Sequence, residues 1–150
     1  QTDPDALAAA LAERPKVVLV ETPSNPLMRV VDIRRITADA KAVGALAVVD
    51  NTFLSPALQQ PIALGADLVV HSTTKFLNGH SDVIGGAVIA ADKAVGEELA
   101  AWANTIGVTG SPLDAYLTLR GLRQGGGGDR HQQREGENGT ARHGKSSGGF

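Results

Sequence analysis

The sequence predicts an α/β domain built on a mostly parallel sheet with helices on both faces. Short apolar segments alternate along the chain with segments whose apolar residues recur at helical spacing, the pattern of successive βαβ units. The first two apolar segments begin at positions 16 and 45, the separation expected of one such unit. Hydrophobic residues make up 42% and charged residues 20% of the chain, a composition typical of a globular core.

The first half of the chain shows this alternation most clearly. The segment KVVLVE at 16–21 is a buried strand by its apolar run, and the turn TPSNP follows it because its two prolines break regular structure. A helix comes next, with Asp32 as its N-cap and Gly44 as its C-terminal stop. Apolar residues between them recur three and four positions apart. The segment ALAVVD at 45–50 is the second strand.

The second half repeats the pattern. The expected elements are a short helical segment, two strands and two helices, at residues 57–64, 67–71, 84–90, 92–105 and from 112 onward. Pro61 interrupts the helical segment, and Gly65 ends it. Ser111 caps the last helix, with Pro112 at its first helical position.

Composition changes abruptly at residue 124. Residues 124–150 contain only Ala141 and Phe150 from the hydrophobic class and nine of the 18 glycines. Such a segment buries too little apolar surface to offset the entropy of ordering it. We therefore expect an ordered domain over 1–123 and a glycine-rich tail over 124–150 that is disordered or the product of a frame shift.

Charge and composition narrow the class of protein. The formal net charge of −2 gives no basic excess, so no nucleic-acid partner is expected. No apolar run approaches the ~20 residues of a membrane span, and no signal-peptide layout is present. The absence of cysteine excludes a disulfide framework and a catalytic thiol within these 150 residues. A cytoplasmic protein with no membrane partner is the expectation.

Polar residues gather where the predicted strands end. Sites in open parallel sheets form just beyond the carboxyl ends of the strands. Three successive strand ends carry such residues here: Asn25 after the first, Asp50 to Thr52 after the second, and His71 to Lys75 after the third. The sequence therefore predicts a functional site at this edge of the sheet.

Lys75 is the candidate nucleophile of that site. A lysine that is partly desolvated at a sheet end favours its neutral amine, which can attack an aldehyde. The hydroxyls of Ser72, Thr73 and Thr74 could bind an anionic group such as phosphate beside it. The alternatives are a solvated surface charge for the lysine and a capped turn for the hydroxyls.

Asp50 and Asn25 each allow two interpretations. A carboxylate that ends an apolar strand needs a partner, and a protonated ring nitrogen is one such partner. An Asx-turn or a helix cap formed with the following residues is the alternative for Asp50. Asn25 lies between two prolines and is a turn residue by default.

A metal site is a further alternative, using His71 and His80 with Asp82. Their spacing matches none of the compact metal-binding signatures, and this hypothesis would require activity that a chelator removes. The sequence also lacks a phosphate-binding P-loop, a dinucleotide fingerprint and a G-x-S-x-G nucleophile elbow.

Three segments of the sequence resemble a known family. They are VETPSNPLMRVVDI, AVVDNTFLSPALQQPIALGADLVVHSTTKFLNGHSDVIGG and NTIGVTGSPLDAYLTLRGLR. Together they are similar to the pyridoxal-phosphate-dependent enzymes of Cys/Met metabolism (transsulfuration), over nearly all of residues 16–123. The block S-x-T-K-x-x-x-G-H-S-D is specific to that family. The resemblance implies the central part of a fold-type-I large domain.

The resemblance also implies roles for individual residues. Lys75 would bind pyridoxal 5'-phosphate covalently and move protons on the substrate, and Asp50 would pair with the pyridinium nitrogen. The other implied cofactor-binding residues are Ser72 and Thr74 at the phosphate, Thr52 near the ring and Asn25 near the phenolic oxygen. His80 and Asp82 are interpreted as residues that shape the loop.

The reaction implied is a γ-replacement in methionine biosynthesis. Cysteine displaces the acyl group of an O-acylhomoserine, for which O-succinylhomoserine is the expected form, and cystathionine results. Related members of the family carry out γ-elimination or direct sulfhydrylation, so those reactions stay open. The implied parent enzyme is a homotetramer that acts on small amino-acid substrates. A non-catalytic fragment is the alternative from another class.

Overall fold

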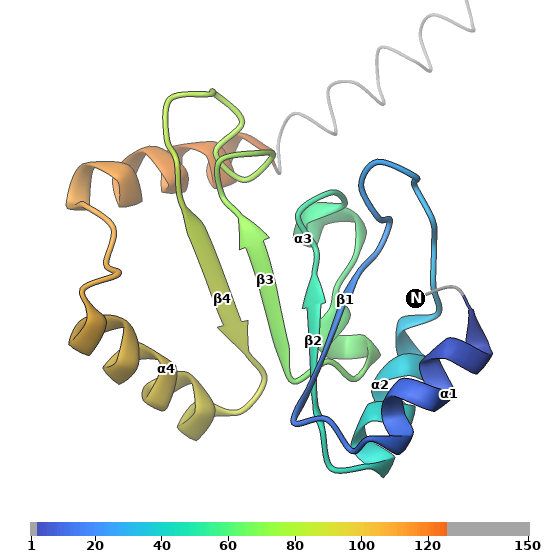
Figure 1. Ribbon diagram of the computed structural model, residues 1–150. Helices are drawn as coiled ribbons and strands as arrows, with labels where there is room; N and C mark the ends of the chain where they lie inside the picture. The colour runs from blue at the N-terminus through green and yellow to red at the C-terminus, as the bar shows by residue number, and fades with distance from the viewer. Residues whose placement is uncertain (1–2, 126–150) are drawn as a thin grey trace, which may run out of the picture.

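A computed structural model of the protein describes residues 3–125. Its centre is a four-stranded sheet in the order β1-β2-β3-β4. The strands span Val17–Glu21, Leu46–Asp50, Leu68–Ser72 and Gly86–Ala90. The first three run parallel, and β4 returns antiparallel to β3 (Figure 1). The predicted strands are thus all present, and the mostly parallel α/β sheet is confirmed.

The helices follow the sequence signals with two differences. As expected, α2 (Ile33–Ala42) begins after Asp32, whose carboxylate accepts a hydrogen bond from the Arg35 amide. The first helix, α1 (Pro4–Ala12), was not predicted from the sequence. Its N-cap residue, Asp3, accepts hydrogen bonds from two backbone amides. The helical segment expected at 57–64 is instead two short helices, α3 (Ser55–Leu58) and the 3-10 helix η1 (Pro61–Leu64).

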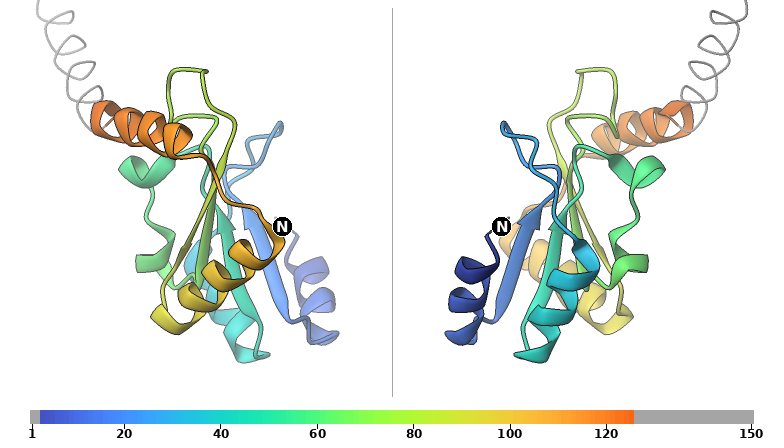
Figure 2. Two further views of the ribbon diagram at one scale, coloured as in Figure 1. Left: turned by 90° about the vertical axis from the view of Figure 1, so that its left-hand side faces the viewer. Right: turned by 90° about the vertical axis from the view of Figure 1, so that its right-hand side faces the viewer.

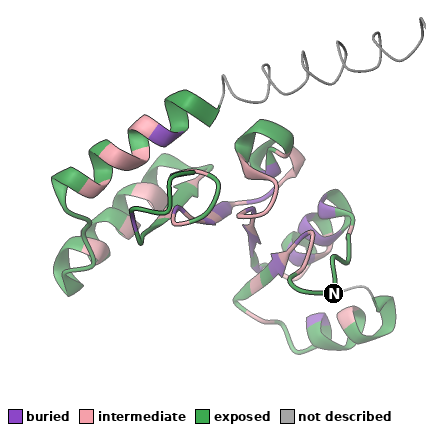
Figure 3. Ribbon diagram, turned by 90° about the horizontal axis from the view of Figure 1, so that it is seen from above, coloured by how far each residue is buried: buried purple, intermediate pink, exposed green. Residues whose placement is uncertain are grey.

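One face of the sheet carries the main hydrophobic core. Val49 of β2 and Val69 of β3 are paired in register and point to the same side. The core cluster around them consists of Val20, Ile33, Ile36, Val49, Ala66 and Val69. It therefore joins the three parallel strands to α2 and to the segment after η1. Figure 3 shows the buried residues gathered in the strands and α2.

The opposite face is covered unevenly. Gly96 of α4 (Lys93–Ile106) packs near the Ala90 side chain, and Ala90 is paired with Leu68, whose neighbour in β2 is Val48. Helices therefore lie on both faces, as the sequence predicts. Toward β1 this second face is open, with Val17 50% and Leu19 63% exposed.

A final helix at residues 112–125 lies beside the loop that joins β3 to β4. Both side views in Figure 2 show this helix, in orange, near the loop. It continues two residues past the expected domain end at 123, and the rest of the predicted tail lies outside the described residues. Among the helices that the structure describes, none is long and apolar enough to cross a membrane.

Candidate active site

Four of the predicted site residues are joined by hydrogen bonds at the carboxyl edge of the sheet. The Thr52 amide donates to Asp50 Oδ1 at 2.9 Å, and the Ser72 amide donates to Thr52 Oγ1 at 2.8 Å. The Lys75 amide in turn donates to the Ser72 carbonyl at 3.2 Å. These bonds connect the end of β2 to the end of β3 and place both strand ends in one local structure.

Asp50 and Ser72 lie on the same face of the sheet. Asp50 is in register with Val70, and Ser72 follows Val70 by two residues, so alternation returns it to the same side. The hydrogen bond from the Thr52 amide to the Asp50 side chain forms the Asx-turn that was one of the two interpretations of Asp50. Within residues 3–125 no hydrogen bond reaches the other carboxylate oxygen of Asp50, which leaves that atom free to accept from a ligand.

The three hydroxyls before Lys75 differ in what they can bind. Ser72 is half-buried, and its hydroxyl makes no hydrogen bond to the described residues. Thr74 Oγ1 accepts from the Gly85 amide at 3.0 Å and donates to the Gly85 carbonyl at 3.3 Å. Thr73 is buried, and its hydroxyl packs where a Cβ on Gly85 would lie. Burial of Thr73 therefore argues against the expectation that its hydroxyl helps to bind an anion.

Lys75 is exposed, which corrects the expectation of a partly desolvated amine. It lies in the turn after β3, and its carbonyl accepts from the Gly79 amide at 2.9 Å. Desolvation of an amine requires apolar groups packed around it. None of the described segments packs over Lys75, so the sequence pattern alone overestimated its burial.

Asn25 lies in the exposed loop after β1, at the same edge of the sheet. Its amide donates to Glu21 Oε2 at 3.2 Å, and Glu21 is the register partner of Asp50. The Asn25 side chain makes no hydrogen bond to Asp50, Ser72 or Lys75. The structure thus brings Asn25 to the correct edge but leaves it outside the hydrogen-bonded group.

His71 points to the opposite face from Asp50, into the space below α3. It lines a pocket of about 610 Å³ together with Asn51 and Val69. Burial lowers the pKa of His71 below its ordinary value, and the charge of Asp50 and the Asn51 carbonyl offset this only in part. His80 Nδ1 donates instead to the Asn78 carbonyl at 2.6 Å.

The metal hypothesis gains no support from this arrangement. Among residues 3–125 no group of three or more His, Cys, Asp or Glu side chains is placed to hold a metal ion. His71 and His80 belong to different parts of the β3 end, one buried in the strand and the other exposed in the loop.

His71 is expected to make the folded chain less stable in mild acid. The unfolded chain takes up a proton at about pH 6.5, whereas the buried ring resists it, so stability is full above that pH and falls below it. Below that pH the free energy of unfolding should fall by up to about 1.4 kcal/mol per pH unit because of His71, and His71→Gln should abolish this contribution to the slope. Urea unfolding at several pH values measures the slope, with exposed His80→Gln as the control. Identical slopes for wild type and His71→Gln would contradict the assignment.

The structure also shows residues that sequence analysis did not single out. Asn78 is fully buried, and its side-chain amide donates to Asp82 Oδ1 at 2.8 Å. Arg120 donates to the other oxygen of Asp82 at 2.7 Å. These hydrogen bonds lower the pKa of the Asp82 carboxyl, so it stays ionised near neutral pH. No spacing signal predicts the pair, because 38 residues separate its members.

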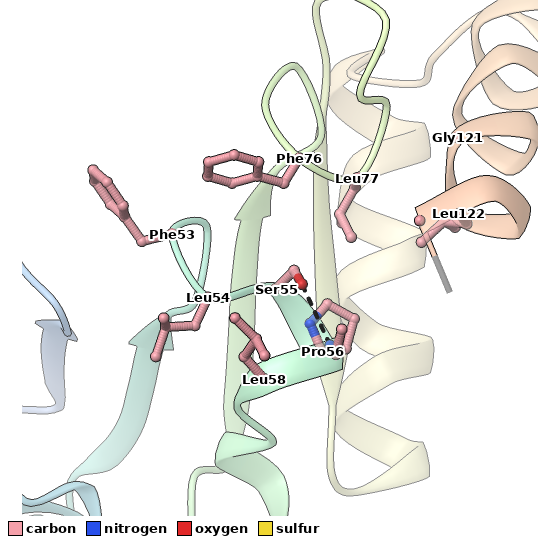
Figure 4. A pocket seen from close by; sticks show the side chains of 11 residues that line it. Phe53, Leu54, Ser55, Pro56, Leu58, Phe76, Leu77, Gly121 and Leu122 are labelled. Carbon is pink, nitrogen blue, oxygen red and sulfur yellow. Dashed lines mark hydrogen bonds between the residues drawn. The ribbon is translucent and has the colours of Figure 1, made fainter. Parts of the chain in front are cut away.

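An apolar pocket of about 560 Å³ lies between α3, the loop that joins β3 to β4, and the final helix at 112–125. Figure 4 shows its side chains, with Phe76 and Leu77 from the loop, Leu58 from α3 and Leu122 from the helix. Phe76 directly follows Lys75 and is 62% exposed. This pocket supplies mostly apolar surface beside the lysine, and the hydroxyl of Ser55, which also lines it, accepts from the Ala57 amide at 3.3 Å.

The fold and these side chains define a class of protein: an α/β domain with a carboxylate, hydroxyls and an amine at the carboxyl edge of its sheet. Residues 1–125 match the family described as Cys/Met metabolism PLP-dependent enzyme. The chain belongs to this family, whose cofactor is pyridoxal phosphate. The family resemblance predicted from the sequence is confirmed.

Relatives in this family are similar over most of the chain. Cystathionine gamma-synthase of Escherichia coli (strain K12) is 70% identical over 123 residues, 82% of this chain and 32% of that protein. Cystathionine beta-lyase of Lactococcus lactis subsp. lactis (strain IL1403) is 52% identical over 119 residues, 79% and 31% of the two chains.

Solved structures agree with this likeness. The crystal structure of cystathionine gamma synthase from Xanthomonas oryzae pv. oryzae in complex with aminoacrylate and cysteine has a TM-score of 0.83 and 63% identity. The match covers 84% of this chain and 33% of that one. The chain therefore spans about a third of the length of the relatives it matches.

Proposed function

We propose that this chain forms the central part of a cytoplasmic enzyme that uses pyridoxal phosphate to make cystathionine by γ-replacement. The observation that carries the proposal is the hydrogen-bonded group that joins Asp50 and Thr52 to Ser72 and the Lys75 backbone. The similarity to cystathionine gamma-synthases supports the reaction class. Cystathionine beta-lyase is a similar relative, so the substrate needs its own test.

The donor set fits the cofactor. The free oxygen of the Asp50 carboxylate would accept a hydrogen bond from the ring N–H, and the Ser72 hydroxyl would donate to the phosphate. Thr74 would add a second donor by giving up its long bond to the Gly85 carbonyl, since bonds to an anion are stronger. Thr52 would lie near the ring, and Asn25 would reach the phenolic oxygen from the neighbouring loop.

Lys75 would hold the cofactor covalently and then move protons on the substrate. Pyridoxal phosphate, when bound, serves as an electron sink that acidifies the substrate Cα. A γ-replacement needs proton transfer at both Cα and Cβ, and one base close to both carbons can serve. Lys75 is exposed on its turn, so its amine is accessible to an added cofactor.

Asp50→Asn is expected to weaken pyridoxal phosphate binding about 10- to 100-fold, because a charged partner of the ring N–H is replaced by a neutral one. Absorbance titration of the chain with pyridoxal phosphate measures this, and Asp92→Asn at the α4 cap is a control with a carboxylate far from the site. Equal affinities for wild type and Asp50→Asn would exclude Asp50 as the ring partner.

The substrate is tested by supplying the protein with pyridoxal phosphate, cysteine and either O-succinylhomoserine or O-acetylhomoserine. We expect cystathionine to form faster from the succinyl ester. Release of a keto acid without added cysteine would point to γ-elimination, and homocysteine formed from sulfide would point to direct sulfhydrylation.

A second candidate function, a non-catalytic fragment, is favoured by the exposed Lys75 and by the open apolar face at Val17 and Leu19. Exposed apolar surface of this kind promotes association. The homotetramer that the family resemblance implies is the alternative form of association. Light scattering separates an open-ended size distribution from a defined tetramer, and turnover by the chain would exclude the fragment hypothesis.

A further inference from the structure

The loop that carries Lys75 is held at three places. At its base, Thr74 exchanges two hydrogen bonds with the Gly85 backbone. In its middle, the backbone amide of Asn78 donates to the Thr73 carbonyl at 2.9 Å, and the backbone amide of Gly79 donates to the Lys75 carbonyl at the same distance. These bonds make a tight turn around Lys75. Most of them are local, so they set the shape of the turn rather than its place on the domain.

The third hold comes from the final helix. Arg120 forms an ion pair with Asp82 at 2.7 Å, and Asp82 also accepts from the buried Asn78 side chain at 2.8 Å. One residue further on, Gly121 is buried against the carbonyls of Leu77 and Asn78, where a Cβ would overlap both oxygens. The helix therefore contacts both the side chains and the backbone of the Lys75 turn.

The contacts of Asp82 with Asn78 and Arg120, which we call the clamp, differ from those of an ordinary surface ion pair. Exposed pairs contribute little to stability because both side chains lose entropy and water screens the charges. Here each carboxylate oxygen of Asp82 has a separate donor, and one donor is a fully buried amide. Asp82 and Arg120 are themselves partly exposed, at 40% and 31% of their side chains, so the buried Asn78 side chain is what sets this pair apart. Loss of the Asp82 carboxylate weakens the acceptor of that buried amide, which costs more than an exposed ion pair contributes.

We propose that Asp82 and Arg120 are positioning residues, which clamp the Lys75 turn to the helix at 112–125 and so hold the lysine at the sheet edge beside Asp50 and Ser72. The inference rests on the proposed function only in naming Lys75 as the reactive group. The clamp itself is a property of residues 73–85 and 112–125. It gives the final helix a role in the site although that helix supplies no group to the cofactor.

Amide hydrogen exchange tests the clamp without any cofactor. In Asp82→Asn and Arg120→Gln we expect the backbone amides of Asn78 and Gly79 to exchange on the order of tenfold faster than in wild type. The Asn51 amide, which bonds to Val70 in the sheet, is the internal reference and should not change. Glu97→Gln, which breaks the exposed Lys93–Glu97 pair on α4, is the matched control.

Two further variants separate a specific link from general loosening. The double variant Asp82→Asn/Arg120→Gln should exchange no faster than Asp82→Asn alone, because that single variant already removes the ion pair that Arg120→Gln breaks. Arg120→Lys keeps a cation opposite Asp82 and should recover part of the protection. Multiplicative effects in the double variant, or unchanged exchange in both single variants, would overturn the proposal.

Reduction of the cofactor adduct at Lys75 with borohydride gives a second test of the positioning role. With saturating pyridoxal phosphate and borohydride, the fraction of Lys75 carrying the reduced cofactor should fall several-fold in Asp82→Asn, with the sheet amides unchanged. A normal fraction with a loosened turn would overturn the positioning role. If wild type shows no adduct at Lys75 while the exchange effects appear, the clamp stands and the proposed function fails.

Discussion

Lys75→Ala is expected to abolish covalent binding of pyridoxal phosphate. The wild-type chain should show an absorbance band at the visible edge when the cofactor is added, and borohydride should fix the cofactor to a peptide containing Lys75. Alanine has no amine, so both signals should disappear, and turnover should fall by at least about three orders of magnitude. This is the largest functional effect that the site predicts.

Lys93→Ala is the matched control for this experiment. Lys93 is a highly exposed lysine on α4 that pairs with Glu97 at 3.5 Å, and its removal should leave the absorbance band intact. Equal bands in wild type and Lys75→Ala would reject Lys75 as the attachment point. In that case reductive labelling followed by peptide mapping would identify which other lysine reacts.

Gly121→Ala is expected to destabilise the docking of the final helix by about 1–3 kcal/mol. Helix propensity alone predicts the opposite sign, because alanine is favoured over glycine inside a helix by about 1 kcal/mol. The buried Cβ would overlap the carbonyl oxygens of Leu77 and Asn78, so the helix must move away from the Lys75 turn. Urea unfolding monitored by circular dichroism measures the change.

Gly125→Ala provides the comparison within the same helix. A Cβ at Gly125 would meet nothing within 4 Å, so this substitution should be neutral or slightly stabilising. A stabilising Gly121→Ala would show that the helix does not press against the loop. It would also remove the backbone contact on which the clamp proposed for Asp82 and Arg120 partly depends.

Sequence patterns were sufficient for the positions of the strands along the chain and for most helices. The apolar segments at 16–21 and 45–50 are β1 and β2 to within one residue, and Asp32 caps α2 as expected. The antiparallel direction of β4 was not predicted, because a buried apolar run has no direction of its own. The helix α1 was missed, although Asp3 followed by Pro4 is an N-terminal helix signal.

The candidate site was only partly predictable. The sequence placed Asp50, Ser72 and Lys75 at neighbouring strand ends, and the structure joins them through Thr52. It could not show that Thr73 is buried or that Lys75 is exposed, because burial depends on what packs over a residue. His71 was grouped with the same strand end, yet it faces the pocket on the other side of the sheet.

The sequence by itself determined the α/β alternation, the polar strand ends and the family, because periodicity, caps and motifs are written in neighbouring residues. Only the tertiary structure decided which polar groups share a face, how Asp82 meets Arg120 and why residue 121 has no side chain. These contacts join residues that are distant in sequence. Their distances follow from strand register and helix docking, which no local spacing encodes.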